Sequence, residues 1–325
     1  MRANARVQIY RESERVQSYH ENGSWEDRQQ YAFEGYTENR YFTSDRFIPL
    51  NERFERADGK PLKGIGLEIE TECFLFNEHW YNGQTAYAEI LKKVIFAEFP
   101  EHLFKIQEDG SLTSGVSAEC ITQPMTKEFI RNNYRIFKLM YNHYFPIFNI
   151  SCVETGHCGM HCNISNALFG RDEKTQENAI RKLYYMVNRH FNLMCRLFNR
   201  DTDNTGYCEQ MDYSEAKTLN LHGQRSNHYI CFNLGHYDSG RIELRLVGGQ
   251  KDFGCFRNTI ESIFHLIEAS KTLKWEDLDD LTKIFSGCNR YVYDRLNTLV
   301  YADGYITREQ LDKIHETVNM EVVYI

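Results

Sequence analysis

Residues 64–76 read GIGLEIETECFLF, and this alternation of apolar and acidic residues predicts a β-strand with two different faces. Side chains two positions apart on a strand share a face, so Leu67 and Ile69 point to the same side. The other side carries three carboxylates, those of Glu68, Glu70 and Glu72. Neighbouring carboxylates repel one another unless positive charge lies between them. The strand therefore indicates either a cation site or the solvated face of an antiparallel sheet.

The rest of the chain alternates between strand pairs and helices. Further strands are predicted over residues 103–107, 117–123, 148–154, 159–165, 229–234 and 241–247. Helices are predicted over residues 85–99, 127–143, 173–199, 256–273, 275–285 and 307–318. This order favours an α+β fold with a mostly antiparallel sheet and helices packed on one face.

Composition indicates the domain organisation and argues against one class of function. Residues 1–60 contain ten basic and eleven acidic residues but only five Val, Ile or Leu, so we expect a polar N-terminal arm before a folded domain over 61–325. The helical C-terminal part of that domain begins at about residue 251. Thirty-eight Lys and Arg against 46 Asp and Glu give a net charge of −8, which argues against strong nucleic-acid binding.

Cellular location is predicted from the cysteines and from hydropathy. The chain has ten cysteines and no export signal at its start, which favours reduced thiols in the cytoplasm. No apolar run approaches the roughly 20 residues of a membrane-spanning helix. We therefore expect a cytoplasmic protein that does not enter a membrane.

Four further motifs each carry a metal-ligating residue on a predicted strand or turn. They are Asp109 in EDGSL, Glu119 in SAECI, His161 in GMHCN and Glu243 in RIELRL. Carboxylates are the ligands that Mg²⁺ and Mn²⁺ prefer, and two-metal phosphoryl-transfer sites combine several of them. Arg241 and Arg245 share the face of Glu243, where they either form ion pairs or contact phosphates.

Zinc is a competing hypothesis. Cys152, His157, Cys158, His161 and Cys162 lie within eleven residues. However, the alternation of a strand would place Cys158 and Cys162 on the face opposite His161. The spacing also differs from the paired ligands of structural zinc sites.

Common nucleotide-binding motifs are absent from the sequence. There is no G-x-x-x-x-G-K-[ST] loop and no G-x-G-x-x-G turn. If a nucleotide binds, metal ions and arginines must hold its phosphates.

Six motifs in order, GLEIETE, EDGSL, SAECITQPM, CGMHCNIS, RSNHYICFNL and RIELRLVGG, resemble the amidoligase family. This family is a branch of the carboxylate-amine ligases, which include glutamine synthetase and glutamate-cysteine ligase. The resemblance covers about residues 64–252. It implies a glutamine-synthetase-like catalytic domain over 61–325 that uses ATP and two or three Mg²⁺ ions, with Mn²⁺ as an alternative.

The resemblance also implies roles for particular residues. The metal ligands would be Glu68, Glu70, Asp109, Glu119, His161 and Glu243. The groups contacting phosphate or the substrate carboxylate would be Arg225 and Arg245. Two positions depart from the family pattern: Asn163 stands where a second His is usual, and Gln250 stands where a Thr is usual.

The expected function is therefore an ATP- and Mg²⁺-dependent amidoligase that forms an amide bond through an acyl phosphate. Its partners would be carboxylate and amine substrates, either small molecules, amino acids or peptides, and an oligomer is compatible with the family. Two alternatives stay open at this point. One is a metal-dependent hydrolase or nuclease that uses the same acidic cluster, and the other is a non-catalytic structural protein.

Overall fold

The computed structural model covers the 325-residue chain. It describes residues 63–74, 87, 90, 91, 95, 99, 103–107, 116–153, 158–202, 206, 208–302 and 304–320. The predicted arm at 1–60 lies outside the described residues, as does Asp109. Of the predicted helix 85–99, the described residues Tyr87, Ile90, Leu91 and Ile95 are helical and buried.

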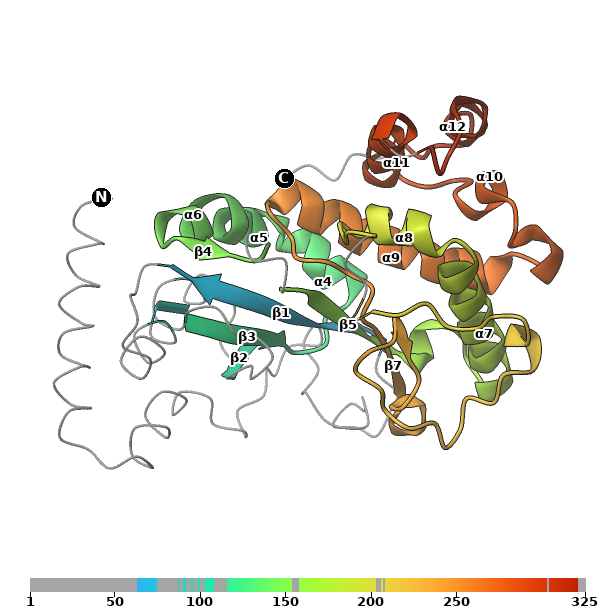
Figure 1. The fold of residues 1–325 in the computed structure, drawn as a ribbon, viewed down its shortest axis with the longest axis horizontal. Helices are drawn as coiled ribbons and strands as arrows, with labels where there is room; N and C mark the ends of the chain where they lie inside the picture. Colours follow the sequence, from blue (N-terminus) through green and yellow to red (C-terminus); the bar gives the residue numbers. More distant parts are fainter. Residues whose placement is uncertain are drawn as a thin grey trace, which may run out of the picture.

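A seven-stranded antiparallel sheet forms the centre of the fold (Figure 1). Its strands are β1 (Ile65–Cys73), β2 (Phe104–Gln107), β3 (Val116–Thr122), β4 (Ile150–Ser151), β5 (Met160–Ser165), β6 (Phe232–Asn233) and β7 (Arg241–Leu244). The order is β2-β3-β1-β5-β7-β6, and β4 also pairs with β1. Every pairing between these strands is antiparallel, which confirms the predicted α+β class with a mostly antiparallel sheet.

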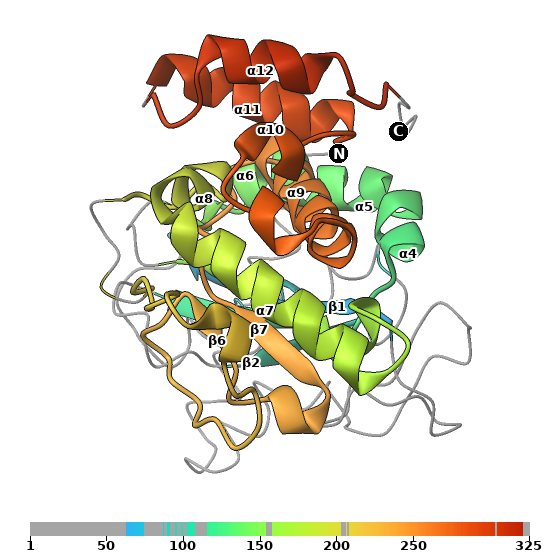
Figure 2. The same ribbon diagram turned by 90° about the vertical axis from the view of Figure 1, so that its right-hand side faces the viewer.

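Helices form a layer beside the sheet. They are α4 (Lys127–Asn132), α5 (Tyr134–Leu139), α6 (Phe145–Ile147), α7 (Glu173–Arg189), α8 (Phe191–Leu197), α9 (Phe253–Thr272), α10 (Leu281–Ile284), α11 (Arg290–Ala302) and α12 (Arg308–His315). Figures 1 and 2 both show α4, α5, α8 and α9 on the same side of β1, with α10 to α12 stacked beyond α9. The helix layer buries the apolar strand face, on which Ile65 and Leu67 have no exposed surface.

Three predicted helices are interrupted. The helix expected over 173–199 breaks at His190, whose Nε2 atom contacts the Leu278 carbonyl oxygen at 2.9 Å. The helix expected over 127–143 breaks at Asn133, between α4 and α5, and a π-helical turn, Met140–Tyr144, follows α5. The segment predicted as one helix over 275–285 contains a 3₁₀ turn, Trp275–Asp277, followed by the four-residue α10.

The helix layer is also held together by one buried carboxylate. Glu261 on α9 accepts hydrogen bonds from Arg131 of α4 at 2.8 and 2.6 Å and from the Tyr134 hydroxyl of α5 at 2.7 Å. Asn289, just before α11, donates to the same carboxylate at 2.7 Å. A buried charge is stable only when paired and hydrogen-bonded, so Glu261 specifies how these helices meet.

Candidate functional site

The register of the sheet aligns polar residues from five neighbouring strands on the face opposite the apolar one. Residues paired across an antiparallel sheet point to the same side. The pairs are Glu70 with Glu119, Glu68 with His161, Asn163 with Glu243, and Glu243 with Asn233. The row of carboxylates predicted on β1 therefore continues across β3, β5, β7 and β6. We call these aligned residues the acidic row, although they include one histidine and two asparagines: Glu68, Glu70, Glu119, His161, Asn163, Asn233 and Glu243.

His161 lies at the centre of this row. Its Nδ1 atom is 3.2 Å from Glu68 Oε2 and 3.8 Å from Glu243 Oε1. Its Nε2 atom is 3.6 Å from Glu70 Oε1. One imidazole thus contacts three of the carboxylates that the sequence selected as metal ligands, although they come from two separate strands.

The charges of the row shift the pKa values of its central pair. Burial raises the pKa of Glu68, but the hydrogen bond and charge of His161 outweigh burial and hold it below its ordinary value. Burial lowers the pKa of His161, but Glu68 and Glu70 outweigh burial and hold it above its ordinary value. Both directions have the same cause, because carboxylates gathered on one face favour positive charge between them.

Glu70 is oriented by the backbone of the neighbouring strand. Its Oε2 atom accepts a hydrogen bond from the Gly159 amide, just before β5. A Cβ at position 159 would lie 3.3 Å from that oxygen and 3.2 Å from Arg200 Nη2, so glycine permits the close approach. Glu70 is 6% exposed, and its carboxylate has a fixed direction.

The donor set fits a divalent metal ion. Glu68, Glu119 and His161 each offer one ligand atom, and these three atoms lie within 4.8 Å of one another. The two carboxylates are ligands that Mg²⁺ and Mn²⁺ prefer, and the imidazole is a ligand more typical of transition metals. Glu70 and Glu243, which contact the same imidazole, extend the acidic surface around that position.

Arg245 lies next to the acidic row. Its Nη1 atom donates to Glu243 Oε1 at 2.6 Å and lies 3.4 Å from His161 Nδ1. Its Nε atom donates to the His228 carbonyl oxygen at 3.1 Å. Within the described residues the Nη2 atom has no hydrogen-bond partner, so it is the part of this fixed guanidinium that an anion can approach.

Two asparagines belong to the site, and one of them was not singled out from the sequence. Asn163 donates to Glu68 Oε1 at 2.7 Å and accepts from Arg241 Nε at 2.9 Å, so it acts as a hydrogen-bonding residue beside the cluster. Asn233, fully buried, donates to Glu243 Oε2 at 2.7 Å and to the Ser226 hydroxyl at 3.1 Å. Asn233 therefore positions Glu243 and the loop that carries Arg225.

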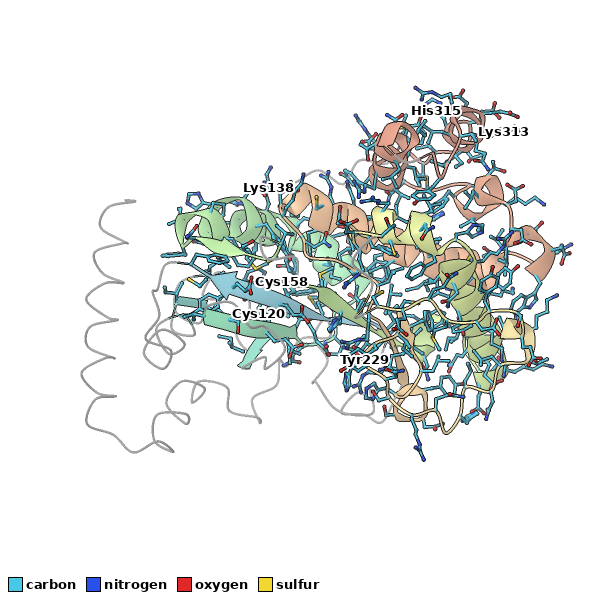
Figure 3. All side chains as sticks on the ribbon, viewed as in Figure 1. Cys120, Lys138, Cys158, Tyr229, Lys313 and His315 are labelled. Atoms are coloured by element: carbon cyan, nitrogen blue, oxygen red, sulfur yellow. The ribbon has the colours of Figure 1, made fainter. Side chains whose placement is uncertain are left out.

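Arg225 is placed differently from Arg245. It lies on a loop over residues 219–229, which we call the Arg225 loop and in which residues 222–229 are exposed. Among the described residues, no hydrogen bond or ion pair joins its guanidinium to the acidic row. Backbone contacts still link the loop to the site, because a Cβ at Gly235 would lie 2.3 Å from Ser226 Cα. Figure 3 shows Tyr229 of the same loop on the side of the sheet away from α9.

The geometry disfavours a zinc site built on the cysteines. Cys162 has no exposed surface and lies on the face of β5 opposite His161. Burial raises the pKa values of the Cys158 and Cys162 thiols. All ten cysteines are free, and His157 lies outside the described residues.

No protein-family model matches the chain, and no curated protein matches it either.

In the described part of the chain, none of the helices combines the length and apolar character needed to cross a bilayer.

Proposed function

We propose that this protein is an ATP- and Mg²⁺-dependent amidoligase with a glutamine-synthetase-like catalytic domain. The observation that carries the proposal is the convergence of Glu68, Glu119 and His161 within 4.8 Å, with Arg245 hydrogen-bonded beside them. The ordered motifs that resemble the amidoligase family support it. Neither the carboxylate nor the amine substrate is specified by these residues.

The proposed reaction has two chemical steps. ATP transfers its γ-phosphoryl group to a substrate carboxylate, which gives ADP and an acyl phosphate. The lone pair of an amine then attacks the acyl carbon and forms the C–N bond, the C–O bond to phosphate breaks with its electron pair on the departing inorganic phosphate, and the nitrogen loses a proton. The products are an amide, ADP and phosphate.

The residues of the site have separate tasks in this proposal. Glu68, Glu119 and His161 would hold a divalent ion, while Glu70 and Glu243 complete the acidic surface. When bound, such an ion supplies positive charge to the phosphate oxygens of ATP. Asp109 keeps its proposed role as a ligand on the strength of the resemblance.

Arg245 would hold a phosphoryl group. Its guanidinium is fixed by Glu243 and the His228 carbonyl before any substrate arrives, so little reorganisation accompanies anion binding. Arg225, on its exposed loop, would contact a phosphate or the substrate carboxylate. Two guanidinium groups on separate elements suit a reaction in which two anions must meet.

The direct test is product analysis. The protein is incubated with ATP, Mg²⁺ and a panel of carboxylates and amines, and ADP, phosphate and amide are quantified. We expect the three products in equal amounts and their loss in Glu119→Gln. Glu276→Gln, which removes an exposed carboxylate from the 275–277 turn, serves as the matched control and should keep full activity.

Other outcomes would contradict the proposal in distinguishable ways. AMP and pyrophosphate in place of ADP and phosphate would exclude an acyl phosphate. Phosphodiester cleavage without any nucleotide requirement would favour the hydrolase alternative. Failure of the folded protein to bind Mg²⁺-ATP in calorimetry would favour the non-catalytic alternative.

A further inference from the structure

The Arg225 loop is attached to the rest of the protein at both ends. At its start, Leu221 is fully buried and Arg181 Nε of α7 donates to the Leu219 carbonyl at 2.8 Å. Toward its end, Asn233 donates to the Ser226 hydroxyl at 3.1 Å. Between these attachments the residues are exposed, so the position of the middle of the loop depends on few contacts.

His222 makes most of those contacts. Its Nδ1 atom is 2.7 Å from Asp238 Oδ1, in the 3₁₀ turn η6 (Tyr237–Ser239). Its Nε2 atom is 3.2 Å from Glu177 Oε1 and 3.5 Å from Glu173 Oε1, both on α7. The second oxygen of Asp238 accepts from the Gly223 amide at 2.8 Å. One imidazole thus joins the loop to two other elements.

This arrangement requires two protons on the imidazole. Carboxylates only accept hydrogen bonds, and a neutral imidazole has a single N–H, so it can satisfy one side alone. The hydrogen bond to Asp238, followed by the one to Glu177, holds the pKa of His222 above its ordinary value. The doubly bonded form therefore exists below this raised pKa and is lost as the pH rises through it.

The groups around His222 are predominantly negative. Glu173 and Glu177 face it from α7, and Asp238 faces it from η6. The one cation among these neighbours, Arg181, pairs with Glu177 Oε2 at 3.1 Å. The Tyr237 ring lies 5.0 Å away and stays neutral, because burial raises its pKa to about 12. Deprotonation of His222 would leave three carboxylates beside a single guanidinium.

We propose that His222 is a pH-dependent clamp, which when protonated holds the Arg225 loop against α7 and η6 and when neutral releases it. The clamp stands on the contacts of His222 alone. Its consequence, regulation of anion binding through Arg225, rests on the proposed function.

Trypsin cleavage after Arg225 measures release of the loop directly. The Arg225–Ser226 bond packs closely against Gly235, where a Cβ would be 2.8 Å from Arg225 C, so we expect cleavage to be slower while the loop keeps this position. Cleavage of the full chain is followed by mass spectrometry at about pH 6 and about pH 8.5, on either side of the His range. Rates are divided by those of a free peptide of residues 219–229, which removes the pH dependence of trypsin.

The expected result is a normalised cleavage rate in the native protein about two- to fivefold higher at the upper pH, as for the loss of exposed ion pairs. His222→Gln should be cleaved at the faster rate at both pH values. Asp238→Asn, which keeps an acceptor for Gly223 but loses the charge, should behave similarly. His315→Gln, on α12 far from the loop (Figure 3), should match the native protein.

Two results would overturn the clamp. One is an equal cleavage rate of the native protein and His222→Gln at both pH values while circular dichroism shows both folded. The other is a pH dependence that persists unchanged in His222→Gln. Because the assay contains no ATP or metal, failure of the ligase proposal would leave these outcomes unaffected.

Discussion

Arg245 and Arg241 flank Glu243 in the sequence, but their guanidinium groups have different surroundings. Arg245 donates to Glu243 and lies beside His161. Arg241 instead donates to Asn163. A guanidinium can hold two phosphate oxygens in fork geometry, and a lysine cannot. The two arginines therefore offer a comparison within one strand.

We expect Arg245→Lys to lower kcat about 10²- to 10³-fold, as for the loss of one charge-stabilising donor. Arg241→Lys should have a smaller effect, because Asn163 stands between its guanidinium and Glu68. The measurement is the steady-state rate of ADP release at saturating ATP. Equal losses in the two variants, or near-normal kcat in Arg245→Lys, would contradict the phosphate role of Arg245.

Glu119 gives a second test at the residue scale. It lies opposite Glu70 in the sheet, so Glu119→Gln removes one of several close negative charges. We expect weaker Mn²⁺ binding in calorimetry, with thermal stability in EDTA unchanged or slightly higher because repulsion is relieved. A large loss of stability in EDTA would instead identify Glu119 as a structural residue.

Sequence patterns predicted the charged part of this site better than the neutral part. Strand parity was enough to assign Glu68 and Glu70 to one face, because alternating side chains leave no other arrangement. Asn233 carries no charge and interrupts no pattern, so only its register with Glu243 reveals its role. The available signal was the sequence HYDSG at residues 236–240, between β6 and β7, because its turn-forming residues indicate a hairpin that pairs the residues on either side.

At the scale of elements, the limits of the prediction have identifiable physical causes. The break between α7 and α8 follows from the contact of His190 with the distant Leu278 carbonyl, which periodicity does not encode. Helix α11 was not predicted, although Val292, Leu296 and Leu299 have helical spacing and are buried. Its tyrosine, valine and threonine residues favour strands by propensity, and packing outweighs that preference.

The contact of α9 with α5 provides a test of element packing. Phe256 of α9 has no exposed surface, and its ring stacks on Phe137 at 4.7 Å between centroids. Phe256→Ala should lower the free energy of unfolding by about 3–5 kcal/mol, through lost burial and the cavity left behind. Urea denaturation measures this. Phe256→Leu, which restores much of the buried volume without the ring, should lose clearly less, and equal losses would show that the lost volume is not the source.

At the scale of the whole molecule, one apolar core joins the sheet to the helix layer. Buried side chains form a single cluster that runs from Ile65 on β1 to Ile314 on α12. Within the described residues, the sheet and the C-terminal helices therefore share a core. The α+β class was predictable because it depends only on the order of periodic segments, whereas the meeting of helices at Glu261 depends on contacts between residues distant in sequence.

Glu261 makes the stability of this shared core depend on pH. Burial raises the pKa of Glu261, but hydrogen bonds from Arg131 and Tyr134, together with the Arg131 charge, outweigh burial and hold it below its ordinary value. A carboxylate whose folded-state pKa is depressed contributes stability above its unfolded pKa of about 4.3. That contribution is lost as the pH falls through the folded-state pKa.

Glu261→Gln should lower the free energy of unfolding by about 2–4 kcal/mol near neutral pH, because Arg131 loses its buried counter-charge. Protonation removes the same charge from the native protein, so the difference between the two proteins should shrink as the pH falls below about 4. Urea denaturation at a series of pH values measures both effects.

The matched control is Glu268→Gln, which removes an exposed carboxylate that pairs with Lys271 on the same helix. Its free energy of unfolding should stay within about 0.5 kcal/mol of that of the native protein. If Glu261→Gln lowers the free energy of unfolding by the same amount below about pH 4 as at neutral pH, the carboxamide disrupts packing and the charge of Glu261 contributes nothing.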